Sequence, residues 1–279
     1  MKASDCGYIS FKDVVFRFSN DLANVLNGIS FSIRRGSFTA IIGPNGSGKS
    51  TLARHTNGLL VPTAGEVSVD GMDTRISANI PDIRRRVGFV FQNPDNQLVG
   101  TTVEEDTAFG PENLGMHPST IKESVEFALE VTGLAELAGR PPHMLSGGQK
   151  QQLAIAGALS MKTECLVLDE PTSMLGPTGK RSVMELLIRI KRDLNMTLVV
   201  VTHFMEEAVL ADRILVIGDG RIVMDGTPQQ VFKSRSLLLD IGLELPGPAE
   251  LSGRLREIGV PLPDPVLTVD ELVECLCRL

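Results

Sequence analysis

One stretch of nine residues has the types and spacing needed to hold the phosphates of a nucleotide. It consists of Gly43, Pro44, Asn45, Gly46, Ser47, Gly48, Lys49, Ser50 and Thr51. Glycines allow backbone angles that other residues avoid, so consecutive N–H groups can turn inward around phosphate oxygens. In this G-x-x-x-x-G-K-[ST] pattern, Lys49 is placed to reach the β and γ phosphates, and the Ser50 hydroxyl is placed to bind Mg²⁺. We call these residues the P-loop and expect them to bind a nucleoside triphosphate.

The segments on either side of the P-loop favour this interpretation over a glycine-rich turn without a ligand. The apolar residues 39–42 before it predict a buried strand, and residues 52–54 after it begin a helix. The N-terminal end of a helix carries a partial positive charge and free N–H groups, which suit a phosphate. The P-loop is therefore expected at a strand-to-helix connection.

Two adjacent carboxylates end another hydrophobic strand. Asp169 and Glu170 follow the apolar residues 166–168. Beside a P-loop, the first acid at such a strand end holds Mg²⁺ opposite the Ser50 hydroxyl. Glu170 is then placed to orient the water that attacks the γ-phosphate, or to accept its proton. The alternative is a pair of acids that are merely solvated.

An imidazole ends a third hydrophobic strand. His203 follows the apolar residues 199–201 and Thr202. A histidine in this position, taken alone, is more often an ordinary packed side chain. With a P-loop and paired acids in the same chain, we expect it to contact the γ-phosphate or the attacking water.

A second candidate anion site precedes a helix-forming segment. Its five residues are Leu145, Ser146, Gly147, Gly148 and Gln149. Ser146 is a favourable N-cap, and the residues from 149 to 159 favour a helix, so the glycines lie at a helix N-terminus. We call these five residues the signature motif.

The rest of the chain predicts an α/β fold with a mostly parallel sheet. N-terminal segments with alternating apolar residues predict antiparallel strands, and later apolar strands alternate with helical segments, which is typical of parallel strands joined by crossover helices. The predicted strands cover residues 14–18, 29–33, 65–71, 87–91, 165–168, 197–201 and 214–217. The predicted helices cover residues 118–139, 180–193 and 205–210.

The same pattern divides the chain into two domains. Residues 1–227 form a P-loop nucleotide-binding domain, into which a helical subdomain of about residues 95–160 is inserted between sheet strands. Residues 228–279 are rich in proline and contain two short amphipathic helices, so we predict a small C-terminal domain of helical and irregular structure.

Composition narrows the class of partner. The 279 residues carry a net charge of −7, which argues against nucleic acid as the main partner. Hydrophobic residues make up 42% and charged residues 22%, as in ordinary globular proteins. The four cysteines form no C-x-x-C pair, and no apolar run approaches the roughly 18 residues that span a bilayer. We expect a peripheral protein if a membrane is involved.

Together, these motifs resemble the ATP-binding cassette (ABC) ATPases over residues 8–228. In that family two cassettes pair head to tail, and the signature motif of one closes over ATP on the P-loop of the other. The resemblance implies that Gln92 belongs to the loop that senses Mg²⁺ and the membrane partner, and that His203 is the switch histidine. It also places Phe18 where an aromatic ring stacks on adenine. Phe18 shares a predicted strand face with Val14 and Phe16, so packing in the core is an equal alternative.

A narrower resemblance is carried by residues 91–97, 102–106 and 108–113. These segments are similar to the ATPase subunits of energy-coupling factor transporters, which import vitamins or cobalt and nickel ions. The resemblance implies ATP and Mg²⁺ as cofactors and a place on the cytoplasmic face of the cell membrane. It also implies three partners: a second cassette subunit, identical or different, a transmembrane coupling subunit, and a substrate-binding membrane subunit. The small C-terminal domain would then assist dimerisation.

Two positions depart from the family pattern. Gln152 stands where the family usually has arginine, and Gly176 stands where it usually has an aspartate that crosses the dimer interface near the attacking water. Gly176 leaves open a subunit that hydrolyses ATP slowly or not at all. A cassette of DNA repair or translation is a further alternative, although this chain has a single P-loop and no heptad run.

Overall fold

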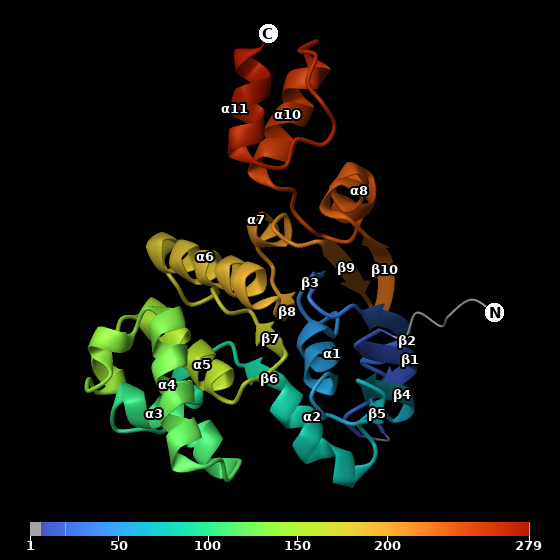
Figure 1. Ribbon diagram of the computed structural model, residues 1–279. Helices are drawn as coiled ribbons and strands as arrows, with labels where there is room; N and C mark the ends of the chain where they lie inside the picture. The colour runs from blue at the N-terminus through green and yellow to red at the C-terminus, as the bar shows by residue number, and fades with distance from the viewer. Residues whose placement is uncertain (1–6, 20, 279) are drawn as a thin grey trace, which may run out of the picture.

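Two sheets and the helices around them form the body of the protein (Figure 1). The computed structural model describes residues 7–19 and 21–278; the outermost residues of the two predicted domains, 1–6 and 279, lie outside this range. In the part of the chain so described, no helix is both long and apolar enough to cross a membrane.

The larger sheet has six strands in the order β10-β9-β3-β8-β7-β6. Neighbours from β9 to β6 are parallel, and β10 pairs antiparallel with β9. The strands are β3 (Phe38–Ile42), β6 (Val87–Val90), β7 (Cys165–Asp169), β8 (Thr197–Val201), β9 (Arg213–Gly218) and β10 (Arg221–Gly226). Every residue of β3, β7 and β8 is buried, as expected of parallel strands with both faces covered.

The smaller sheet is antiparallel, in the order β2-β1-β4-β5. Its strands are β1 (Ile9–Phe16), β2 (Leu26–Ile33), β4 (Ala64–Val69) and β5 (Met72–Asp73). The predicted N-terminal antiparallel strands are thereby confirmed. Phe11 of β1 stacks on Phe31 of β2 at 4.5 Å between ring centroids, which fixes the pairing of the two strands from inside the core.

Two hydrophobic clusters lie on opposite faces of the parallel sheet. Alternate residues along each strand point to opposite faces, so Leu198 and Val200 of β8 join one cluster while Val199 and Val201 join the other. The second cluster is closed by the antiparallel sheet together with α1 (Lys49–His55) and α2 (Ile80–Arg86).

The first cluster is covered by the helices of the inserted subdomain and by α6. These helices are α3 (Val103–Asn113), α4 (Pro118–Thr132), α5 (Gly147–Ser160) and α6 (Pro177–Leu194). The prediction of one helix over residues 118–139 is wrong at its C-terminal end. Gly133 adopts a left-handed conformation with φ 75° and caps α4, and a short 3₁₀ turn, Ala135–Leu137, follows.

The C-terminal segment packs in two ways. It contains α8 (Pro228–Lys233), α9 (Arg235–Asp240), α10 (Gly247–Glu257) and α11 (Val269–Cys277). The short α7 (Met205–Ala208) lies earlier in the chain, between β8 and β9. Side chains of α8 and α9, such as Phe232 and Leu238, belong to the large cluster. Leu262, Val266 and Leu272 of α11 form a small separate cluster, against which Leu255 of α10 packs. These last two helices project from the body at the top of Figure 1.

Candidate functional site

The P-loop connects β3 to α1, as predicted. At Gly48 the backbone has φ +101°, and a Cβ atom there would lie 2.9 Å from Leu26 Cδ2 and 3.0 Å from the Val25 carbonyl oxygen. At Gly43 a Cβ would lie 2.1 Å from the Ile217 carbonyl oxygen. The loop therefore passes so close to β2 and to the end of β9 that only glycine fits at these two positions.

Lys49 is held across this loop. Its Nζ donates to the carbonyl oxygens of Gly43 at 2.8 Å and Pro44 at 2.9 Å. Burial lowers the pKa of Lys49, and the nearby carboxylates of Glu170 and Asp169 oppose this effect. An ammonium group has three N–H donors, so one remains for a phosphate oxygen in the position that the carbonyls define.

Ser50 and Asp169 face each other at the start of α1 and the end of β7. The Ser50 hydroxyl donates to Asp169 Oδ1 at 2.8 Å. Burial raises the pKa of Asp169, and the Ser50 hydrogen bond and the charge of Arg54 oppose this. Hydroxyl and carboxylate oxygens are the ligands that Mg²⁺ prefers, and Mg²⁺ is usually held by one or two such groups together with substrate phosphates. This pair of a hydroxyl and a carboxylate fits that description. The described residues include no cluster of three His, Cys, Asp or Glu that could hold a metal.

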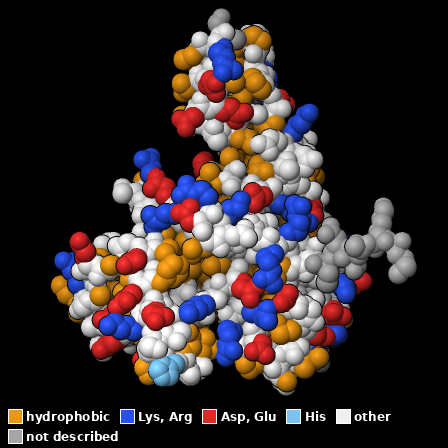
Figure 2. Space-filling view, viewed as in Figure 1, with side chains coloured by type: hydrophobic (Ala, Val, Ile, Leu, Met, Phe, Trp, Pro, Cys, Tyr) orange, Lys and Arg blue, Asp and Glu red, His pale blue; other side chains and the backbone are white. Residues whose placement is uncertain are grey.

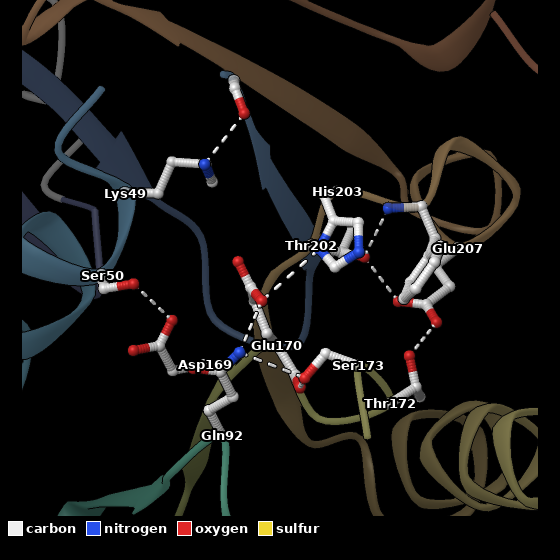
Figure 3. Close-up of polar contacts among 12 residues, drawn as sticks. Lys49, Ser50, Gln92, Asp169, Glu170, Thr172, Ser173, Thr202, His203 and Glu207 are labelled. Atoms are coloured by element: carbon white, nitrogen blue, oxygen red, sulfur yellow. Dashed lines mark hydrogen bonds and ion pairs between the residues drawn. The ribbon is translucent and has the colours of Figure 1, made fainter. Parts of the chain in front are cut away.

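Three side chains that are distant in the sequence meet beside this pair (Figure 3). Glu170 Oε2 accepts from Gln92 Nε2 at 2.9 Å and lies 3.4 Å from His203 Nδ1. Gln92 comes from the end of β6, Glu170 from the end of β7 and His203 from the end of β8. The structure thus gathers these three predicted residues around one carboxylate, in an arrangement that can orient a water molecule for attack on a phosphorus atom.

Sequence reasoning missed several polar side chains that lie on the same segments as Gln92, Glu170 and His203 or bond to them. Ser173 accepts from Gln92 at 3.3 Å and donates to the Glu170 carbonyl oxygen at 3.0 Å. Thr172 and Thr202 both donate to the buried carboxylate of Glu207. Thr172 and Thr202 could have been found from the sequence, because they lie within two residues of Glu170 and His203. Glu207 carried no such signal, since its segment was predicted only as an ordinary helix.

The signature motif begins α5, and most of its residues line a hollow at the surface. Ser146 Oγ accepts from the Gln149 N–H at 3.3 Å, and the Gln149 side chain accepts from the Ser146 N–H at 2.9 Å, which forms a capping box. The hollow in front of these residues is lined by the start of α6, including Gly176, and within the described residues it receives no P-loop side chain. This chain alone does not bring its two candidate phosphate sites together.

Phe18 lies at the surface just beyond β1. Its side chain is 59% exposed and meets the buried Phe16 edge to face at 5.0 Å between centroids. Phe16 in turn contacts His55 of α1, so this end of β1 adjoins the helix that follows the P-loop. The alternative that Phe18 packs in the core with Val14 and Phe16 is wrong, because the strand ends at Phe16. Stacking on adenine stays a prediction.

Comparisons with known proteins agree with one another. The model of the family described as ABC transporter matches residues 26–173. The chain is 56% identical to the energy-coupling factor transporter ATP-binding protein EcfA1 of Symbiobacterium thermophilum, over 91% of this chain and 88% of that protein. It is 46% identical to the EcfA1 protein of Clostridium perfringens (strain 13 / Type A), over 97% and 98%.

Two solved structures are similar along most of the chain. CbiO1 from Clostridium perfringens, part of the ABC transporter complex CbiONQ, has a TM-score of 0.78 and 35% identity, over 91% of this chain and all of that one. The ATP-binding cassette MJ0796, solved as a dimer in a post-hydrolysis state with ADP and Pi, has a TM-score of 0.70 and 30% identity, over 79% and 98%.

We expect Glu170→Gln to separate nucleotide binding from hydrolysis. The P-loop is untouched, so affinity for ATP should stay at the wild-type value, while phosphate release should fall by roughly 10²–10⁴-fold, the usual effect of losing a positioned base. Affinity and phosphate release are measured on the same preparation. Glu185→Gln, an exposed glutamate on α6, is the matched control. Hydrolysis at the wild-type rate in Glu170→Gln would contradict the role assigned to this carboxylate.

We expect Gly176→Asp to raise the rate of ATP hydrolysis at least several-fold with little change in affinity. Gly176 is the N-cap of α6 with no side-chain cap, and a Cβ at this position meets nothing within 4 Å, so aspartate fits without strain. A charged hydrogen bond is worth about 1.5–3 kcal/mol, whereas the change of cap alone is worth a few tenths of a kcal/mol. Gly176→Asn adds the cap without the charge and serves as the control. If the rate of Gly176→Asp stays level or drops, the chain positions its water by other groups.

Proposed function

This chain belongs to the ABC transporter family, and we propose how it works as the ATP-hydrolysing subunit of an energy-coupling factor importer. Two such cassette subunits would pair, and the P-loop and the signature motif of one chain would then act on two different ATP molecules. The observation that carries this proposal is that the hollow in front of the signature motif is bordered by no P-loop residue of the same chain, within the part that the structure describes. The dimer of MJ0796 with ADP and Pi, similar in fold at 30% identity, supports a paired arrangement.

In such a pair, each ATP would lie between the P-loop of one subunit and the signature motif of the other, and we call this a composite site. The contacts in the structure indicate the role of each side chain in it. Lys49 and the loop N–H groups hold the phosphates, because Lys49 supplies an ammonium fixed by two carbonyl oxygens and the loop leads into the start of α1. Ser50 and Asp169 would hold Mg²⁺, with Gln92 nearby; the ion supplies neutralisation of phosphate charge. Glu170 orients the attacking water and accepts its proton. His203 holds the Glu170 carboxylate in place from the end of β8. Phosphoryl transfer needs mainly such positioning and charge stabilisation.

A groove between the sheet and the helical subdomain supports the proposal that a helix of the transmembrane subunit docks here. The groove is lined by the end of β6, the following loop, α3 and α5, and it exposes Phe91, Val99 and Phe109. Asp106 keeps the loop in place, since its Oδ1 accepts from the N–H groups of Val99 at 2.6 Å and Gly100 at 2.8 Å. Because Gln92 follows Phe91 directly, a helix seated in this groove would adjoin the residue that contacts Glu170. This contact would hold the subunit at the membrane face.

The C-terminal helices support a further part of the proposal, a role in holding the pair together. Exposed apolar side chains occur on α10 (Leu251), just after it (Ile258) and on α11 (Val269 and Val273). Figure 2 shows hydrophobic side chains at the surface on both sides of this projection, among charged ones. Exposed apolar side chains gathered on one small unit are typical of an interaction surface.

The composite site can be tested with two defective chains that carry different tags. Ser146→Arg should abolish hydrolysis but keep ATP binding, because the changed helix end faces the partner's nucleotide. In a mixed pair with Lys49→Ala, one composite site carries both defects and the other carries neither, so about half of the wild-type rate should return. Phosphate release is measured on pairs isolated through both tags. Inactive mixed pairs would show that the geometry or the independence of the two sites is wrong, and tags that never copurify would identify a different chain as the partner.

The groove can be tested with Phe109→Glu. A buried charge in the docked complex should weaken binding to the membrane subunits at least tenfold, while hydrolysis by the isolated chain stays within about twofold of wild type. Phe127→Glu places the same charge on an exposed aromatic position of α4, outside this groove, and should bind normally. Equal binding by wild type and Phe109→Glu, or equal weakening by both variants, would place the docking surface elsewhere.

A further inference from the structure

A buried carboxylate is hydrogen-bonded to two threonines that lie next to Glu170 and His203 in the sequence. Glu207, on the short helix α7 after β8, is only 6% exposed. Its Oε1 accepts from the Thr172 hydroxyl, and its Oε2 accepts from the Thr202 hydroxyl at 2.7 Å (Figure 3). Both threonines are 1% exposed, so water does not compete for these bonds.

The two threonines belong to the segments that carry the hydrolytic side chains. Thr172 is in the turn after β7, two residues beyond Glu170. Thr202 immediately precedes His203, and its hydroxyl also accepts from the Phe204 N–H at 3.0 Å. Glu207 therefore joins the strand end that carries Glu170 to the strand end that carries His203.

Both carboxylate oxygens of Glu207 act as acceptors in this position. Each threonine hydroxyl donates to Glu207, and Thr202 Oγ1 already accepts from the backbone. A carboxylate accepts from both hydroxyls at once, whereas an amide presents one acceptor and one donor. Burial raises the pKa of Glu207, and the two hydroxyl bonds and the charges of Lys180 and His203 oppose this. A buried carboxylate is costly unless it is hydrogen-bonded, so these bonds are needed to keep it ionised.

A second contact ties the same two segments together. Lys180, in the first turns of α6, places its ammonium 3.1 Å from the centroid of the Phe204 ring, and that ring packs against His203 at 4.0 Å. The segment from Thr172 to α6 and the segment from Thr202 to α7 thus meet at two points, with Glu207 as the buried one.

We propose that Glu207 is a positioning residue for ATP hydrolysis, which sets the separation of Glu170 and His203 by fixing Thr172 and Thr202. This inference rests on the hydrolytic roles proposed above for Glu170 and His203. It requires no contact between Glu207 and nucleotide, so its effect is on turnover and not on affinity.

The test is Glu207→Gln, with kcat, KM and the affinity for a non-hydrolysable ATP analogue measured on the purified subunit pair. A misplacement of about 1 Å can cost 10²-fold in rate, so we expect kcat to fall by about 10- to 100-fold while KM and analogue affinity stay within about twofold. Glu206→Gln, the exposed neighbour on α7, should match the wild type. An unchanged kcat in Glu207→Gln, or a raised KM at unchanged kcat, would overturn the proposal.

The threonines provide a second route that does not depend on the fold of Glu207→Gln. Thr172→Ser and Thr202→Ser keep the hydroxyl and should retain most of the activity, whereas Thr172→Val removes it and should lose kcat as Glu207→Gln does. The double variant Glu207→Gln with Thr172→Val should be no worse than either single variant, because both break the same connection. Losses that multiply, or serine variants as slow as valine, would refute the shared role.

A final comparison distinguishes this inference from the proposed function. In single-turnover measurements, Glu207→Gln should cause no further loss in the Glu170→Gln background if it acts through Glu170. If Glu170→Gln abolishes turnover but Glu207→Gln is as fast as wild type, only this inference fails. If Glu170→Gln itself hydrolyses ATP normally, the proposed function fails, and this inference fails with it.

Discussion

The parallel pairing of four neighbouring strands is the constraint on which the site depends. Parallel strands end at the same edge of a sheet, and in this chain β3, β8, β7 and β6 are neighbours in that order. Their carboxyl ends supply, in turn, the P-loop, His203, the pair Asp169 and Glu170, and Gln92. The pairing is maintained by burial on both faces, since alternate side chains of each strand enter two separate hydrophobic clusters. Loss of register by one residue would exchange the two faces and move every one of these groups.

Several polar groups at this edge are hydrogen-bonded to one another. Lys49 donates to loop carbonyl oxygens, Ser50 donates to Asp169, and Gln92 donates to Glu170. Each of these bonds involves a protein atom that we propose to contact a phosphate, Mg²⁺ or the attacking water when nucleotide is bound. Such mutual bonding avoids the cost of buried polar groups without partners and keeps the side chains close to the positions in which they act. Binding then exchanges hydrogen bonds, and does not require the side chains to be gathered from solvent.

The second proposed phosphate site lies outside this edge. The signature motif is presented by α5, which belongs to the inserted helical subdomain, and its hollow is shared with the start of α6. The same subdomain forms one wall of the groove next to Gln92. One packed unit therefore joins the surface proposed for the membrane partner to the surface proposed for the second cassette. A movement of α3 to α5 against the sheet would reach both, which is a physical route for coupling hydrolysis to transport.

The sequence alone determined those features whose atoms are close along the chain. The P-loop, the capping box of Ser146 and Gln149, and the strands that end at Asp169 and Val201 are local patterns, and local backbone geometry follows from neighbouring residues. Even the error at the end of α4 was local, because Gly133 carries the signal for a helix C-cap. The tertiary structure decided what strand pairing and packing bring together: Gln92 and Glu170, separated by 78 residues, the exposure of Phe18, and the bridge from Glu207 to two threonines. Periodicity predicts that a residue lies on a strand or a helix, but the partner of its side chain depends on the order and register of segments far apart in the chain, which only the folded core fixes.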